Sequence, residues 1–131
     1  MVYSSVYKVG NFSGSHNKSK VKCWLFLQYI DRTWTRGATI KEINFFTGIP
    51  IRTLDSSLNK WWSWQRIHKH LLKEPAPDGS NHLWSITAFG IKYLDAVPID
   101  FHNECILEIN EHQAARRTFL TRYAQVFKLN K

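Results

Sequence analysis

The stretch from Thr39 to Leu94 constrains the fold most, because helix, turn and strand signals follow one another there in a clear order. Thr39 predicts a helix N-terminus, with Glu42 three residues later in a capping-box arrangement. Gly48 then permits a tight turn, and Pro50 suits the first turn of a second helix, where its missing N–H costs little. The segment therefore predicts two helices joined by a short turn, followed by a hairpin and a further short helix.

The second of these helices, over residues 50–64, has one apolar and one polar side. Leu54, Leu58 and Trp61 repeat at helical spacing and are expected to point inward. The residues left on the outside are Arg52, Thr53, Asp55, Ser56, Asn59 and Lys60.

Residues 66–86 predict a β-hairpin. Alternation over 66–72 indicates one strand, residues 74–81 have strong turn chemistry, and residues 82–86 return as a second strand. The hairpin carries basic or potentially basic side chains at Lys69, His70, Lys73 and His82.

The segment from Thr47 to Lys60 resembles the turn and recognition helix of winged helix-turn-helix regulators. Thr87 to Leu94 resembles the Leu-Thr-x-x-Gly-x-x-Tyr-Leu segment that closes many bacterial and archaeal members, with Ile86 in place of the first Leu. The resemblance spans about residues 19–94. It implies an α+β, mainly α fold, a winged helix-turn-helix with a two-stranded wing, to which this chain adds a C-terminal helix.

The resemblance also implies contacts with double-stranded DNA. In that superfamily, small polar and basic side chains of the recognition helix face the groove, and wing residues lie near the backbone. Arginine can bridge guanine O6 and N7, and asparagine can pair with adenine N6 and N7. The expected contacts are Arg52, Thr53, Ser56, Asn59 and Lys60 from helix 50–64, and Lys69, His70, Lys73 and His82 from wing 66–86. The alternative is a merely solvated polar face.

Three features depart from the superfamily pattern. Asp55 lies among the expected groove contacts, where phosphates repel a carboxylate unless it accepts from cytosine N4 or pairs with Arg52. Glu74 and Asp78 at the wing tip weaken the case for deep insertion into a groove. Gln65 stands where the superfamily usually has glycine.

Length and charge agree with a single nucleic-acid-binding domain. The chain has 131 residues, a formal charge of +8 and a pI near 9.7, so a polyanion is its default electrostatic partner. Residues 1–18 contain no acidic residue and predict a basic, partly ordered arm. Ser19 is expected to cap a helix that runs to about Thr33, within a winged-helix domain over 19–98.

That first helix is apolar most of the way round, so it must be packed on more than one side. Either the C-terminal helix or a partner subunit can provide the second contact. The C-terminal segment 99–131 predicts a helix from about His102 to Phe127 with an approximate heptad pattern. We expect it to form a homodimer through Ile109, Phe119, Tyr123 and Val126, and the alternative is a helix folded back on its own domain.

Cysteine usage and hydropathy predict a cytoplasmic protein. Cys23 and Cys105 lie far apart in apolar helical patterns, which indicates buried thiols in a reducing compartment. The longest apolar run, from Cys23 to Leu27, is too short to cross a bilayer, and the N-terminus lacks the apolar core of a signal peptide.

The chain offers little for catalysis. His68, His70 and His82 form the strongest metal constellation, but the wing is exposed and lacks an acidic supporting residue. We therefore expect no metal, no cofactor and no enzymatic activity. The predicted function is sequence-specific DNA binding by a homodimeric transcriptional regulator. The alternative is a protein-interaction module of a replication, transcription or mobile-element complex, docking through the Trp61, Trp62 and Trp64 cluster.

Overall fold

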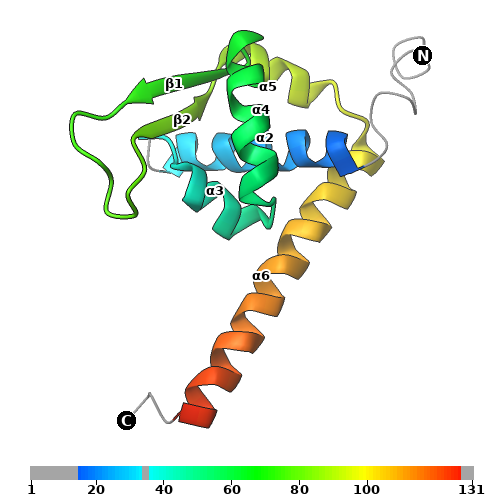
Figure 1. Ribbon diagram of the computed structural model, residues 1–131. Coiled ribbons are helices and arrows are strands. Elements are labelled where there is room, and N and C mark those ends of the chain that lie inside the picture. The colour runs from blue at the N-terminus through cyan, green and yellow to red at the C-terminus, as the bar shows by residue number, and fades with distance from the viewer. Residues whose placement is uncertain (1–14, 34–35, 128–131) are drawn as a thin grey trace.

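The computed structural model describes the backbone of residues 15–33 and 36–127 and the side chains of 18–33 and 36–117. In chain order its elements are α2 (Ser15–Thr33), α3 (Ile40–Thr47), α4 (Ile51–Ser63), β1 (Ile67–Leu71), β2 (His82–Ile86), α5 (Ala88–Asp95) and α6 (Ile99–Phe127). This succession is the expected winged helix-turn-helix with a two-stranded wing and an added C-terminal helix (Figure 1). Within the described ranges, none of the helices is long and apolar enough to span a membrane.

The first helix begins earlier than predicted. Because α2 starts at Ser15, Ser19 lies inside the helix and is not its N-cap, so the predicted arm over 1–18 is too long at its C-terminal end. The rest of that arm, residues 1–14, lies outside the described residues.

Much of the apolar surface of α2 is packed within the chain, although Tyr29 is 53% exposed. Its most deeply buried side chains are Val21, Cys23, Trp24, Leu27 and Ile30, none more than 1% exposed. The helix packs against α3, α5, β2 and α6. Of the two contacts that the sequence left open, the one from the C-terminal helix is present, since α6 packs on α2.

The capping box at the start of α3 is confirmed in full. The Thr39 hydroxyl accepts from the Glu42 backbone N–H at 3.1 Å, and the Glu42 carboxylate accepts from the Thr39 backbone N–H at 2.9 Å. Gly48 ends the helix in the left-handed region, with φ of 81°, as a turn glycine is expected to do. Pro50 is the N-cap of α4, so the helix begins at Ile51, one residue after the predicted start.

The wing is an antiparallel pair in which Ile67 faces Ile86 and Leu71 faces His82. An additional backbone bridge joins Ala38 to Trp84 through two hydrogen bonds of 2.9 and 2.8 Å, which the sequence pattern did not predict. Trp84 is only 6% exposed, so the wing is anchored on the core.

The connections before and after the wing have special backbone geometry at Gln65 and Gly90. Gln65 has a positive φ of 61°, at the position where the superfamily usually has glycine. Thr87 caps α5 by accepting from the Gly90 backbone N–H at 3.0 Å. Gly90 is required for close approach, since a Cβ there would lie 2.4 Å from the Arg66 carbonyl oxygen.

The C-terminal helix divides into two parts. It starts at Ile99, three residues before the predicted start, and buries Cys105 and Ile109 against the domain. Further along, α6 extends away from the remaining elements (Figure 1). The near part of α6, which contains Cys105 and Ile109, is also joined to α2 by ion pairs. Lys18 pairs with Glu104 and Glu108, and Lys22 pairs with Glu108.

Both cysteines are buried and free, as predicted. Burial raises the pKa of the Cys105 thiol to about 11, and it raises the pKa of the Cys23 thiol further. Both are therefore protonated thiols at neutral pH.

Candidate nucleic-acid interface

Helix α4 presents a polar row to solvent because its opposite side is fixed in the core. Leu54, Leu58 and Trp61 are at most 2% exposed, as predicted. Of the predicted groove contacts on α4, the exposed ones are Arg52, Ser56, Asn59 and Lys60, whereas Thr53 is half-buried. Among the described ion pairs there is none between Arg52 and Asp55, so the carboxylate is not neutralised in that way.

The turn before α4 is held by side-chain hydrogen bonds. Asn44 Nδ2 donates to the Ile49 carbonyl oxygen at 2.8 Å, and the Ile49 backbone N–H donates to Thr47 Oγ1 at 3.2 Å. These contacts fix the direction in which α4 leaves the turn.

Helix α6 braces the same turn from outside, which the sequence pattern did not reveal. The His112 Nε2 atom lies 3.0 Å from the Phe45 carbonyl oxygen, and Gln113 donates to the Phe46 carbonyl oxygen. A Cβ on Gly48 would lie 2.8 Å from His112 Nδ1, so the approach is close. The guanidinium of Arg116 lies 4.0 Å from the centre of the Phe45 ring. The near part of α6 therefore supports the helix-turn-helix directly.

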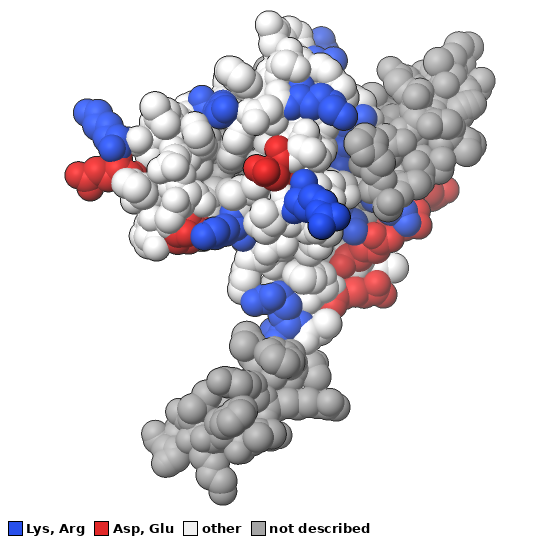
Figure 2. All heavy atoms as spheres, viewed as in Figure 1, with Lys and Arg blue, Asp and Glu red and all other residues white. Residues whose placement is uncertain are grey.

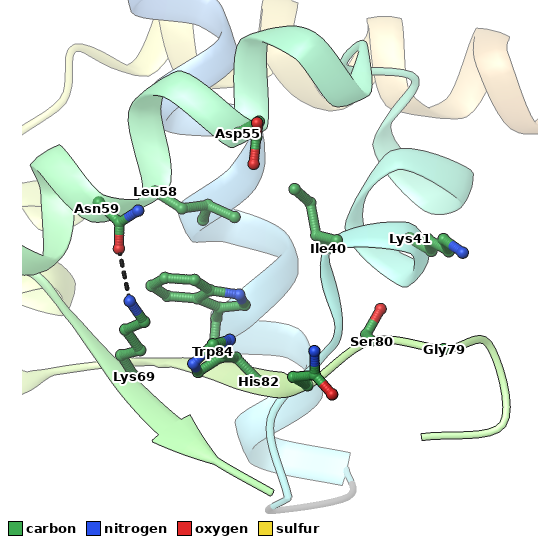
Figure 3. A pocket seen from close by; sticks show the side chains of 11 residues that line it. Ile40, Lys41, Asp55, Leu58, Asn59, Lys69, Gly79, Ser80, His82 and Trp84 are labelled. Carbon is green, nitrogen blue, oxygen red and sulfur yellow. Dashed lines mark hydrogen bonds between the residues drawn. The ribbon is translucent and has the colours of Figure 1, made fainter. Parts of the chain in front are cut away.

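Two predicted DNA contacts, Asn59 and Lys69, bind each other. Lys69 Nζ donates to Asn59 Oδ1 at 2.9 Å, joining β1 to α4 (Figure 3). The same ammonium lies 4.9 Å from the Trp62 ring centre and 5.5 Å from that of Trp84. Lys69 is thus held between the wing and α4 and does not extend freely into solvent.

The remaining wing residues do not gather in one place. Alternate residues of a strand share a face, so the pairing of Lys69 with Trp84 and Leu71 with His82 puts Lys69 and His82 on the side of α4. His70 is on the other face, where its Nε2 lies 3.2 Å from Ser85 Oγ. Lys73 follows β1 and is exposed.

A groove of about 380 Å³ separates α4 from the wing. Figure 3 shows Asp55 and Asn59 on the α4 side, with Trp84, His82 and Ser80 on the wing side. The groove is lined by hydrogen-bond donors and acceptors together with the apolar side chains of Ile40 and Leu58.

The wing loop is fastened to the start of α3. Asp78 Oδ2 accepts from Thr39 Oγ1 at 2.7 Å, and Asp78 Oδ1 accepts from the Ser80 backbone N–H at 2.9 Å. Lys41 Nζ donates to the Asp78 carbonyl oxygen at 2.6 Å. Hydrogen bonds from Ser80 and Thr39 hold the pKa of Asp78 below its usual range. Its carboxylate therefore stays charged at neutral pH and is turned toward the start of α3.

The tryptophan cluster is divided between core and surface. Trp61 is fully buried and meets Trp24 edge to face, with ring centres 5.9 Å apart. Trp62 and Trp64 are 48% and 45% exposed, and Lys20 Nζ lies 5.8 Å from the Trp64 ring centre.

Charge is distributed unevenly over the surface. Figure 2 shows separate basic groups over the winged-helix part and acidic groups gathered beside α6. In the part of the chain that the structure describes, no three histidine, cysteine or acidic side chains meet in a way that could hold a metal ion. His82 is on the opposite face of the wing from His68 and His70, so the three histidines noted in the sequence do not share one face.

No protein-family model matches the chain, and no curated protein matches it. A solved structure described as a MarR family transcription regulator aligns over 97% of this chain and 90% of its own, with 14% sequence identity and a TM-score of 0.45.

Proposed function

We propose that this protein binds double-stranded DNA with α4 in the major groove and the wing beside it. The observation that carries the proposal is the exposed polar row Arg52, Ser56 and Asn59, on a helix whose opposite side is buried. A major groove admits one α-helix, and a helix presented in this way places several side chains against base edges.

The residues have different expected roles. Arg52 and Asn59 have the hydrogen-bonding groups to contact base edges, and Lys60 lies at the edge of the row, where phosphate is the expected partner. Ser56 Oγ donates to the Thr53 carbonyl oxygen at 3.0 Å, so its hydroxyl must rotate or accept to contact DNA. Lys73 is exposed on the wing and suits a phosphate contact, whereas His70 is on the face away from α4.

The experiment is selection from random duplex DNA, followed by affinity measurements over a range of salt concentrations. Arg52→Ala should relax sequence preference at one position by about 1–3 kcal/mol, since a good bidentate base contact discriminates to that extent. Lys60→Ala should weaken binding to all sequences and lower the salt slope by about one unit. If the Arg52→Ala and Lys60→Ala double variant binds every duplex as the unmodified protein does, the proposal is wrong.

We further propose that the protein acts as a homodimeric transcriptional regulator. The distal part of α6 includes Phe119, Tyr123 and Val126 and leaves the domain, so an amphipathic helix is available to a second copy. The side chains of Phe119, Tyr123 and Val126 lie outside the described residues. Ile109, the fourth residue expected in the dimer interface, is 7% exposed and packs within its own chain. A two-fold dimer would bind two half-sites separated by about one turn of DNA.

An apolar groove favours a second candidate function, that of a protein-interaction module. A depression of about 450 Å³ between α2 and α3 is lined by Phe26, Phe45 and Phe46, and Tyr29 and Phe45 are 53% and 50% exposed. Exposed aromatic surfaces of this kind are typical of protein interfaces. Substitution of Tyr29 by serine, which leaves the contact of Arg116 with Phe45 in place, should leave DNA affinity unchanged and weaken partner binding if this candidate is correct.

A further inference from the structure

The bond between Lys69 and Asn59 determines which atoms Asn59 presents to solvent. An ammonium group has donors and no acceptor, so only the carbonyl oxygen of the Asn59 amide can face it. The 2.9 Å contact between Lys69 Nζ and Asn59 Oδ1 therefore orients the amide. Figure 3 shows Oδ1 directed toward Lys69 and Nδ2 directed away from it.

Lys69 is itself held in place. Its ammonium lies near the ring faces of both Trp62 and Trp84, and Trp84 is 6% exposed and bridged to Ala38 by two backbone hydrogen bonds. Cation–π attraction and the hydrogen bond act on the same group. The orientation of the Asn59 amide is therefore fixed before any ligand arrives.

We propose that Lys69 is a positioning residue that makes Asn59 select guanine over adenine. This inference rests on the proposed insertion of α4 into the major groove. A freely rotating asparagine pairs with adenine by accepting from N6 and donating to N7. Here Oδ1 is engaged, and the neighbouring ammonium repels the N6 amino hydrogens. Guanine presents two acceptors, O6 and N7, which suit both the outward Nδ2 donor and the nearby positive charge.

The inference changes the role expected of Lys69. Sequence patterns predict a phosphate contact, whose removal weakens binding to every duplex equally. A positioning residue behaves differently, because its removal changes which base is preferred.

The experiment is sequence selection with full-length protein carrying Lys69→Met, Lys69→Arg or Lys73→Met. Methionine keeps an apolar stem against the two tryptophans but cannot donate. Arginine keeps a donor for Asn59 Oδ1. Lys73→Met removes one positive charge from the same wing without touching α4 and is the matched control. Thermal unfolding of each variant verifies that the fold is retained.

The unmodified protein, Lys69→Arg and Lys73→Met should enrich guanine at one shared position, which Asn59→Ala identifies by losing the preference there. Lys69→Met should enrich adenine at that position, a reversal of about fivefold or more if each pairing has the usual discrimination. Adenine preference in the unmodified protein, or an unchanged guanine preference in Lys69→Met, would overturn the inference alone. Failure of the unmodified protein to enrich any sequence would overturn the proposed function, and this inference with it.

Discussion

Replacing Thr39 by valine should destabilise the protein more than an ordinary capping substitution does. The Thr39 side chain is 2% exposed and makes two hydrogen bonds. Its hydroxyl accepts from the Glu42 backbone N–H at 3.1 Å and donates to Asp78 Oδ2 at 2.7 Å. Valine has nearly the same shape, so the change removes both bonds without leaving a cavity.

The two losses differ in size. Removal of an N-cap hydroxyl costs about 1 kcal/mol of unfolding free energy. A hydrogen bond to a buried carboxylate is worth about 1.5–3 kcal/mol, but Asp78 lies near solvent, and water replaces much of the lost contact, leaving about 1 kcal/mol. The expected total is about 2 kcal/mol, which lowers the melting temperature by about 8 °C in a domain of this length.

Thermal and urea unfolding of three variants separates the two contributions. Thr39→Ser keeps the hydroxyl but loses a buried methyl group, so it should cost about 1 kcal/mol, less than Thr39→Val. Asp78→Asn should lose only the free energy contributed by the hydrogen bond between Thr39 and Asp78. In the Thr39→Val and Asp78→Asn double variant the effects should be less than additive, because both changes break the same bond. Equal stability of Thr39→Val and Thr39→Ser would refute the reasoning.

Two further outcomes follow from the packing of α5 and α6. Gly90→Ala should destabilise the fold by about 1–2 kcal/mol in urea unfolding. The added Cβ would lie 2.4 Å from the Arg66 carbonyl oxygen, and the cost of this clash exceeds the gain of about 1 kcal/mol in helix propensity. A stabilised variant would contradict this. Glu108→Gln should lower the melting temperature at pH 7, and this difference should shrink as the pH falls toward 2. Hydrogen bonds from Lys18 and Lys22 lower the folded-state pKa of Glu108 below 4.5, so its stabilisation is present above that value and is lost as the pH falls through the folded-state pKa. If the melting temperatures of Glu108→Gln and the unmodified protein differ by the same amount at both pH values, this second outcome is contradicted.

Features coded by neighbouring residues were predicted well from the sequence. The capping box at Thr39, the turn at Gly48 and the inward side of α4 each depend on residues within one or two helical turns. Position Gln65 was singled out because glycine usually stands there, and its backbone indeed has a positive φ. The start of α2 was wrong by five residues, since Ser19 is a good cap by type and predicts a start at Lys20, but the chain is already helical at Ser15.

Contacts between distant segments could not be predicted in this way. The bond from Lys69 to Asn59 depends on the distance between β1 and α4, which no spacing in the sequence encodes. The same holds for the contact of Asp78 with Thr39, where a residue expected at an exposed tip is turned toward α3. These contacts determine which polar side chains remain available for DNA, so residue type alone overstates the free basic surface of the wing.

The heptad pattern of α6 predicts a single apolar stripe that forms the dimer interface. In the structure, the residues of this stripe lie in two different environments. Ile109 packs against its own domain, whereas the helix continues past Arg117 to Phe127 away from it. If the distal part forms the dimer, Phe119→Glu with Tyr123→Glu should give a folded monomer, because the charges enter only the interface between copies. Ile109→Glu, the matched control, should instead lower the melting temperature of the domain itself. Sedimentation and thermal unfolding measure the two effects separately. An unmodified protein that remains monomeric at high micromolar concentration would contradict the dimer and leave α6 as a brace for the helix-turn-helix.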